Sequence, residues 1–542
     1  MGENADLMVR PVRLLPLLAV LLSVGVALAA PGRAAARTSP PDAPFTVVIL
    51  DRIDDATFAT LARRGAVGLM RPGYGPTTNR RRALAELVRG AEVNARLGGV
   101  PPGKPLINTN KVSVFPNCHR CIVVQLPPRG RPSANHKLYR IAVIGLGYHG
   151  LLTSPTTRIP GLVSIVDVAP TALRPVRGGM SSTPDSAAVA HLARLGSQIH
   201  GEERLKYAGL FIAVGIVILL ALLGWTAAAR TAIPAALLAN LALGAFHVTN
   251  EVAIVALFTV ASAVGALALA RVCRDDLKLL GLIVGVLLAY LFVFAKRPEW
   301  AAVTPLGPDQ NLRYWGIGDQ IGTLLFAPVL VGAVIARQRL GWVGFLAFSL
   351  LGLFVMTDNR LGANGGGAIG LGLALAVLGA RLSRRGLVAL VGSVAASAAI
   401  VLAIVQHGLA SPGPNHLRSA FGSGVTGFLD VAAHRVPLVY APAVHDWPLT
   451  LPLALLLIAS CVLAFRVTRA RAARDLLVAL TVGLVASLLI NDATGFMLAA
   501  GIGCSSAVAR FAPTGARIRL PVVARLRAAT SAAPATTDSP ST

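Results

Sequence analysis

Charged side chains are scarce in this chain. Only 14% of its 542 residues are Asp, Glu, Lys or Arg, whereas soluble domains carry about 25%. Acidic residues are scarcer than basic ones, because the chain has 24 Asp and Glu but 50 Lys and Arg. Cysteine is also rare, and five residues in a chain of this length exclude a small disulfide-stapled scaffold. Because 54% of the residues are apolar, the composition predicts a membrane protein.

The formal net charge of +26 is compatible with a nucleic-acid-binding protein, but its distribution argues against one. Aromatic residues make up only 5% of the chain, and no basic face interleaved with aromatic side chains is present. Much of the Arg instead stands in short clusters between apolar runs, where it orients membrane helices. We therefore expect membrane lipids, and no nucleic acid, among the partners.

Changes in composition divide the chain into four parts. Residues 1–39 contain an apolar run from Leu14 to Ala30 behind Arg10 and Arg13, which predicts a signal peptide or a first transmembrane anchor. Residues 40–206 have the mixed composition of a soluble domain, and residues 207–510 predict a multi-pass transmembrane domain. Residues 511–542 begin with basic residues and end in an Ala/Ser/Thr/Pro-rich stretch that predicts a disordered tail.

The predicted soluble domain alternates between two kinds of segment. Residues 45–50, 121–126, 139–147 and 161–168 are rich in β-branched residues and bounded by Gly and Pro, which predicts strands. Residues 54–68 and 79–97 have the apolar spacing of helices. Strands alternating with helices predict an α/β domain whose sheet is partly parallel.

Eleven apolar segments follow this domain, and with the N-terminal run they predict a polytopic α-helical protein of about 11–12 transmembrane helices. The segments are residues 208–225, 232–248, 252–270, 278–295, 321–336, 341–356, 366–380, 386–405, 449–465, 476–490 and 495–509.

Alternate connections between these segments are rich in Arg, which predicts the sidedness of the protein in the cell membrane. The basic residues fall in six successive connections, at Arg230, then Arg271 to Lys278, Arg337 and Arg339, Arg381 to Arg385, Arg466 to Arg474, and Arg510 to Arg519. Positive connections stay on the cytoplasmic side. Residues 40–206 are therefore predicted to be extracytoplasmic and the C-terminus cytoplasmic.

Two stretches of the soluble domain, "VVILDRIDDATFATLARRGAVG" and "GLLTSPTTRIPGLVSIVDVAPTAL", resemble the alkaline phosphatase and sulfatase superfamily. The resemblance implies that Asp51 occupies the position of a metal ligand and that Thr77 or Thr78 occupies that of the nucleophile. Chemistry in that superfamily needs two divalent metals, but the Asp-x-x-x-His and Asp-His-Gly motifs that would complete the ligands are missing. The resemblance therefore implies a truncated, degenerate domain without a catalytic metal or other cofactor.

Cys118 and Cys121 flank His119 in "PNCHRC". A structural zinc site needs four ligands, and only His119 is near these two thiols. In the predicted oxidising compartment, the spacing therefore favours a local disulfide.

Polar residues of the membrane half gather in the connections predicted to lie outside. Ionisable groups at the ends of membrane helices are candidates for function, because their burial is costly. We therefore predict that Arg360, Arg418 and Asn364 bind substrate and that His416, Asp319 and Asp492 take part in catalysis. "GANGGGAIGLG" predicts close helix packing rather than a phosphate loop, because no Lys-Ser/Thr ending follows. Tyr314 and Trp315 are predicted interfacial anchors.

The order of "RYWGIGDQ", "DNRLGANGGG", "NHLRSAFGSG" and "INDATG" behind such a domain resembles a group of uncharacterised multi-pass actinobacterial membrane proteins. The architecture is also similar to that of O-antigen ligases and polymerases, which implies a polyprenyl-phosphate-type, lipid-linked substrate at the outer face. A non-catalytic envelope scaffold or sensor that binds an anionic polymer, and a transporter or flippase, are the alternatives.

Overall fold

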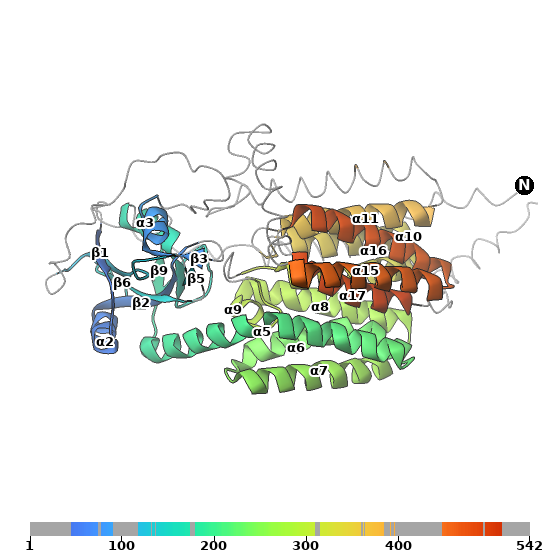
Figure 1. Cartoon of the computed structure of the whole chain (residues 1–542), viewed down its shortest axis with the longest axis horizontal. Helices are drawn as coiled ribbons and strands as arrows, with labels where there is room; N and C mark the ends of the chain where they lie inside the picture. The colour runs from blue at the N-terminus through green and yellow to red at the C-terminus, as the bar shows by residue number, and fades with distance from the viewer. Residues whose placement is uncertain are drawn as a thin grey trace, which may run out of the picture.

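The computed structural model describes an α/β domain at one end of a bundle of long helices (Figure 1). It describes residues 45–73, 77–89, 118–131, 133–135, 137–173, 179–308, 315–358, 361–362, 364–383, 391, 395, 447–491 and 494–511. One helix, α5 (Ala188–Leu222), runs without interruption from the α/β domain into the bundle. The domain boundary that we predicted at residue 206 lies inside this helix.

A mixed seven-stranded sheet forms the centre of the α/β domain, with the strand order β1-β4-β6-β2-β7-β9 and β8 paired to β2. The parallel pairs are β1 with β4, β2 with β7 and β2 with β8, so the predicted partly parallel sheet is present. The strands are β1 (Thr46–Leu50), β2 (Gly65–Arg71), β4 (Cys121–Gln125), β6 (Tyr139–Ile144), β7 (Gly150–Thr153), β8 (Leu162–Ser164) and β9 (Ser181–Thr183).

Two predicted elements of this domain end earlier than the sequence pattern indicated. The helix predicted over 54–68 is α2 (Asp55–Arg64), and Gly65 begins the buried strand β2. A Cβ atom on Gly65 would lie 2.2 Å from the carbonyl oxygen of Val143, so a glycine is needed for β2 to approach β6. The strand predicted over 161–168 ends at Ser164, and the chain continues as the helical turn Ile165–Asp167 and α4 (Val168–Leu173).

Helices cover both faces of the sheet. One apolar core lies between the sheet and α3 (Arg80–Arg89) with α4, and includes Leu87, Ile141 and Val168. The other core lies between the sheet and α2 with the start of α5, and includes Phe58, Leu61 and Leu192. The sheet is therefore the middle of three layers, and α5 is part of that fold as well as of the bundle.

Eight helices in the described part of the chain are long and apolar enough to cross a membrane, which is consistent with a multi-pass membrane protein. They are α5, α6 (Thr226–Phe246), α7 (Glu251–Val272), α8 (Asp276–Lys296), α10 (Asp319–Thr357), α11 (Gly365–Ser383), α15 (Trp447–Val467) and α16 (Arg471–Ile490). The shorter α17 (Thr494–Ala509) is also apolar. The predicted segment 386–405 lies almost entirely outside the described residues.

The long element α10 contains two of the predicted segments, because it folds back on itself at Gly341. Gly341 has φ 75° and ψ −161°, which no helix adopts. A Cβ atom on Gly332 would lie 2.3 Å from Phe348, and one on Gly352 would lie 2.8 Å from Val329. In a straight helix, Gly332 and Phe348 would be roughly 24 Å apart along the axis. The two arms of α10 therefore pack side by side in opposite directions.

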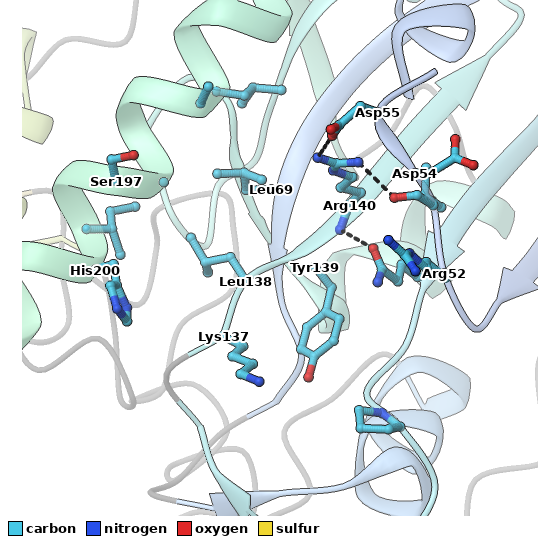
Figure 2. Close-up of a pocket in the computed structure, with 17 residues that line it drawn as sticks. Arg52, Asp54, Asp55, Leu69, Lys137, Leu138, Tyr139, Arg140, Ser197 and His200 are labelled. Atoms are coloured by element: carbon cyan, nitrogen blue, oxygen red, sulfur yellow. Dashed lines mark hydrogen bonds and ion pairs between the residues drawn. The ribbon is translucent and has the colours of Figure 1, made fainter. Parts of the chain in front are cut away.

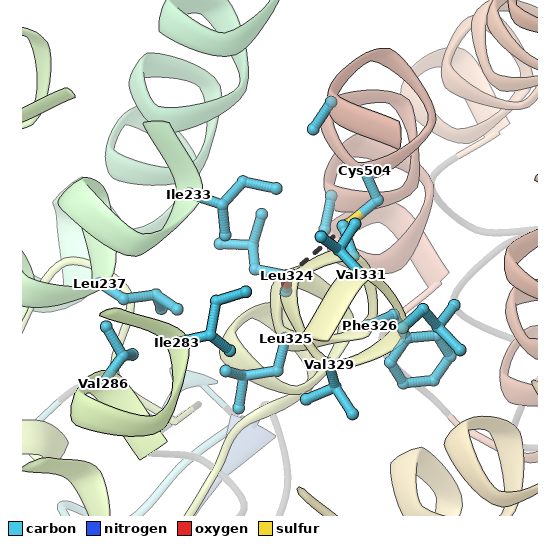
Figure 3. Packing of buried hydrophobic residues seen from close by; sticks show 14 of the residues in the cluster. Ile233, Leu237, Ile283, Val286, Leu324, Leu325, Phe326, Val329, Val331 and Cys504 are labelled. Carbon is cyan, nitrogen blue, oxygen red and sulfur yellow. Dashed lines mark hydrogen bonds between the residues drawn. The ribbon is translucent and has the colours of Figure 1, made fainter. Parts of the chain in front are cut away.

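The first arm of α10 lies in the middle of the bundle. Figure 3 shows Leu324, Leu325 and Val329 of this arm among side chains of α6, α8 and α17, and all three are almost completely buried. Small residues allow the other helices to approach closely. A Cβ atom on Gly370 of α11 would lie 2.8 Å from the carbonyl oxygen of Gly483 in α16. This contact agrees with the close helix packing predicted from "GANGGGAIGLG".

Candidate functional site

A polar stripe on α5 passes from the α/β domain into the bundle. Gln198, Glu202 and Lys206 are four residues apart, so they share one face of the helix, and each is at most 4% exposed. The Gln198 amide donates to the carbonyl of Val303 over 3.4 Å, and the Lys206 ammonium donates to the carbonyl of Pro308 over 2.8 Å. The segment that follows α9 (Glu299–Ala302) thus closes over this stripe.

The carboxylate of Glu202 is the exception on this stripe. Glu202 is 1% exposed, and neither of its oxygens has a hydrogen-bond partner among the described residues. Lys206 lies one turn further along α5, on the same face of the helix. Buried polar atoms without partners are rare in proteins, and each needs an explanation.

The start of α10 lies beside this stripe. A Cβ atom on Gly318 would lie 2.8 Å from Pro308, the residue whose carbonyl accepts from Lys206. Asp319 follows, and its carboxylate accepts from the Asn364 amide over 3.0 Å. Gln320 is 2% exposed, and both polar atoms of its amide lack a partner among the described residues.

Asn364 holds the start of α11 against the start of α10. Its amide nitrogen also donates to the carbonyl of Ile317 over 3.2 Å, and its oxygen accepts from the Gly367 amide over 2.7 Å. We call Glu202, Lys206, Asp319, Gln320 and Asn364 the bundle-end cluster. It combines one cation, two carboxylates and two amides at the end of the bundle that faces the α/β domain.

Two of the residues that the sequence assigned to a site, Asp319 and Asn364, are therefore in direct contact. The other four predicted site residues of the membrane half, which are Arg360, His416, Arg418 and Asp492, lie outside the described residues. Our sequence analysis missed Glu202, Lys206 and Gln320. The four-residue spacing of Gln198, Glu202 and Lys206 places them on one face of a helix and could have indicated the site. We did not use it, because we interpreted residues 40–206 as a separate soluble domain.

Trp315, a predicted interfacial anchor, contacts the α/β domain. It is 7% exposed, and the guanidinium carbon of Arg158 lies 3.5 Å from the centre of its ring. Next to it, an apolar cluster joins Ile159 and Leu162 of the α/β domain with Ala302 and Val303 of the bundle. The stretch that follows Arg158, "GLVSIVDV", thus helps to attach the domain.

The phosphatase-like positions lie after β1 and on the short strand β3 (Thr77–Thr78), which precedes α3. Asp51 follows β1, is 77% exposed in its side chain, and forms an ion pair with Arg80. The hydroxyl of Thr77 accepts from Arg82 over 3.0 Å, and the neighbouring Thr78 is 4% exposed. No three His, Cys, Asp or Glu residues gather as a metal site within the residues that the structure describes.

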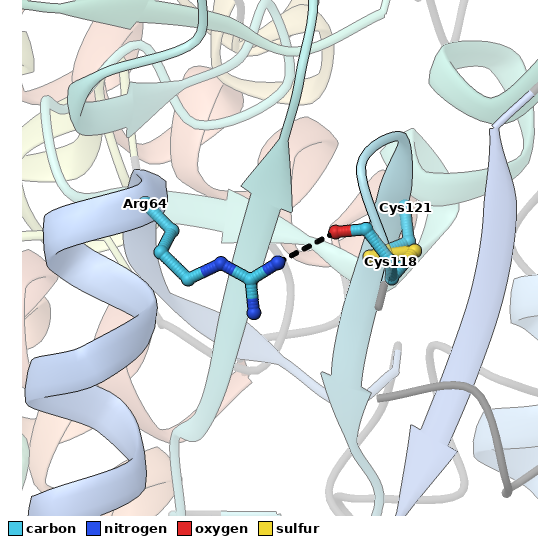
Figure 4. The surroundings of a disulfide bond; sticks show 3 residues. All are labelled: Arg64, Cys118 and Cys121. Atoms are coloured by element: carbon cyan, nitrogen blue, oxygen red, sulfur yellow. Dashed lines mark hydrogen bonds between the residues drawn. A yellow bond between two sulfur atoms is a disulfide. The ribbon is translucent and has the colours of Figure 1, made fainter. Parts of the chain in front are cut away.

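Cys118 and Cys121 are joined by a disulfide at the start of β4, with their Cα atoms 6.0 Å apart (Figure 4). Arg64, the last residue of α2, donates to the carbonyl of Cys118 over 2.8 Å. Both cysteines are buried. The bridge and the arginine together hold the entry to β4 against α2.

The Arg-rich connections gather at the end of the bundle that lies away from the α/β domain, because successive helices run in opposite directions. Some of these arginines have acidic partners there. Arg339 lies 3.5 Å from Asp276, and Arg381 donates to Asp475 over 2.7 Å. Asp276 is 1% exposed. These arginines therefore also connect helices, in addition to the orienting role predicted for them.

Comparison of the chain with models of protein families, with curated proteins and with solved structures finds no match. The fold defines a class of protein, namely a mostly helical chain with apolar helices able to cross a membrane and an N-terminal α/β domain. The resemblances drawn from short motifs remain predictions from the sequence.

Proposed function

We propose that this protein is an integral membrane protein of the cell envelope that acts on a lipid-linked, polyprenyl-phosphate-type substrate at its outer face. The observation that carries the proposal is the bundle-end cluster. Glu202 of α5 and Gln320 of α10 bring polar atoms that have no partner among the described residues to the end of the bundle that faces the α/β domain. Ionisable groups held in such a place at this cost are typical of substrate sites in membrane proteins.

The cluster has the chemistry that such a substrate requires. Lys206 supplies a buried positive charge for a phosphate, and Arg360, four residues before Asn364, is the sequence-predicted second cation. Arg418 completes the predicted set and is able to hold a phosphate by two parallel hydrogen bonds. Glu202 is the group in the cluster that is able to accept a proton from an incoming hydroxyl, and His416 is the sequence-predicted base for the same step.

The first test measures binding of a polyprenyl phosphate to the full chain in nanodiscs. We expect the phosphate to raise the melting temperature and the matching polyprenol to leave it unchanged. Lys206→Met keeps the length of the side chain and removes the charge, so it should abolish the response. Thr231→Val is the control, because Thr231 is buried far from the cluster and its hydroxyl has partners. Equal responses to the alcohol and the phosphate would contradict the proposal.

The second test separates binding from catalysis by complementation of a strain that lacks the gene. If Glu202 is the base, Glu202→Gln should retain binding and lower activity by roughly a hundredfold. His416→Ala should have that effect if His416 is the base. Arg360→Lys and Arg418→Lys should lose function while the protein still inserts. Wild-type growth with all of these variants would rule out a catalytic site here.

A non-catalytic envelope scaffold or sensor is the second candidate. It is favoured by the phosphatase-like positions, because Asp51 and Thr77 are both held by arginines of α3. Under this alternative, deletion of residues 40–187, which leaves α5 and the bundle-end cluster in place, abolishes complementation, whereas all substitutions in the cluster are silent.

A further inference from the structure

A second polar site lies in the α/β domain, in a groove between the sheet and α5 (Figure 2). The groove has a volume of about 790 Å³, which is within the range of small-molecule sites. Its walls are the residues that follow β1, the end of β4, the start of β6 and the first half of α5. Because β1 and β4 are parallel, their carboxyl ends meet at this edge, which is where α/β sheets commonly bind ligands.

The acidic residues of the groove are already engaged. Asp54 caps α2, and the Thr57 amide that donates to it over 2.8 Å holds the pKa of this carboxyl below its usual value. Asp55 forms an ion pair with Arg140, which also donates to the carbonyl of Ile53 over 2.8 Å. The ion pair balances the charge of Asp55, whereas Asp54 stays ionised and is engaged in capping α2.

Two further cations line the groove, and the charge of one of them, Arg52, also acts on Asp54. Arg52 and Lys137 are both exposed, and Lys137 forms no ion pair with any residue that the structure describes. Their charges favour an anion. In Figure 2, Lys137 lies between Tyr139 and His200, so the charge is flanked by hydrogen-bonding side chains from β6 and from α5.

Neutral polar groups also line the groove, which suggests a ligand larger than a bare anion. Gln125 of β4, Ser197 of α5 and the hydroxyl end of Tyr139 reach it from three different elements. Such groups pair with the hydroxyls of a sugar, while the cations pair with its phosphate. We propose that this groove is a binding site for a phosphorylated sugar, either free or attached to a lipid.

The groove and the bundle-end cluster are separate sites. Ser197 and His200 line the groove, whereas Glu202 and Lys206 lie on another face of α5. The groove proposal therefore does not depend on the function proposed for the bundle, and variants in one site leave the other intact.

The test is a titration of the full chain, in nanodiscs of phosphatidylcholine, with glucose 1-phosphate, glucose and inorganic phosphate. We expect glucose 1-phosphate to bind more tightly than the other two. The double variant Arg52→Gln, Lys137→Gln should weaken its binding by about tenfold or more, as expected for the loss of charge-assisted contacts. Arg63→Gln is the matched control, because Arg63 is a basic residue of the same domain that lies outside the groove.

The source of the ligand is resolved by a second set of nanodiscs that contain phosphatidylinositol. Competition by this lipid supports a lipid-attached sugar phosphate, and its failure to compete supports a free one. Circular dichroism verifies that the double variant is folded, which is expected because both residues are exposed. Three results would overturn the proposal. They are no binding of glucose 1-phosphate, equal binding by inorganic phosphate, and undiminished binding by the folded double variant.

Discussion

Single buried polar residues in this protein fall into two groups. Asn240 is fully buried, but its amide lies 3.5 Å from the Tyr290 hydroxyl and its oxygen accepts from the Leu306 amide over 3.0 Å. Gln320 is equally buried and has no such partners among the described residues. A satisfied network stabilises packing, whereas unsatisfied groups cost free energy. This contrast is the reason to place a ligand near Gln320 and none near Asn240.

Glu299, outside the long helices, gives a prediction about pH. Burial raises the pKa of its carboxyl above the usual value near 4.5, although Arg297 lies 3.9 Å away. The folded state therefore retains a proton that the unfolded state has lost. The contribution of this carboxyl to the free energy of unfolding is fully present below about pH 4.5, the unfolded-state pKa. It is lost as the pH rises through the higher pKa of the folded state. Glu299→Gln should raise the melting temperature at neutral pH and leave it nearly unchanged at pH 4.5.

The control for this prediction is Glu251→Gln, which changes a more exposed carboxylate of the neighbouring helix α7. Thermal unfolding in detergent between pH 4.5 and pH 8 provides the measurement. An equal gain from both substitutions, or a gain from Glu299→Gln that does not depend on pH, would show that burial of this carboxyl is not the cause.

Whole helices in the bundle depend on glycine where they cross. α11 and α16 approach so closely that a Cβ atom on Gly483 would lie 2.7 Å from the Cβ atom of Ala374 and 2.9 Å from the carbonyl oxygen of Gly370. Backbone atoms cannot move aside as the end of a side chain can. We therefore expect Gly483→Ala to destabilise the protein by about 1–3 kcal/mol, the usual cost of overpacking.

Gly285→Ala is the matched control for the helix crossing. Gly285 lies within α8, and a Cβ atom there would meet nothing within 4 Å. Alanine has a higher helix propensity than glycine, so this variant should be neutral or slightly stabilising. Melting temperatures in detergent distinguish the two. Similar values for both variants would mean that α11 and α16 are not in close contact.

At the scale of the whole molecule, the direction of α5 and the alternation of the helices place the α/β domain and the Arg-rich connections at opposite ends of the bundle. Because basic connections stay in the cytoplasm, we predict that the α/β domain is extracytoplasmic and the C-terminus cytoplasmic. Single cysteines at Ser186, Ser423 and Ser541, in a chain without native cysteines, allow this prediction to be tested.

A membrane-impermeant thiol reagent should label the cysteines at Ser186 and Ser423 in intact cells, and the one at Ser541 only after lysis. A cysteine at Ser182, in β9 of the α/β domain, is an additional reporter on the same side as Ser186. Labelling of Ser541 in intact cells, or protection of both other positions, would reverse or refute the topology.

The sequence by itself determined the elements whose signal is local. Runs of apolar residues predicted the long apolar helices, because the length and composition of a run are local properties. Segments rich in β-branched residues predicted four strands of the sheet. It also determined that residues 321–336 and 341–356 are two segments, although they form one continuous element, α10, with a reversal at Gly341.

Only the tertiary structure decided which residues meet. Asp319 and Asn364 are 45 positions apart, and Lys206 and Pro308 are 102 positions apart, so no local pattern relates them. No prediction from the sequence concerned Glu202 or Lys206, because their burial depends on the segment after α9 that covers them. The helices were predictable because their signal is local in the sequence. The candidate site was predicted only in part, because burial and contact depend on packing between distant segments.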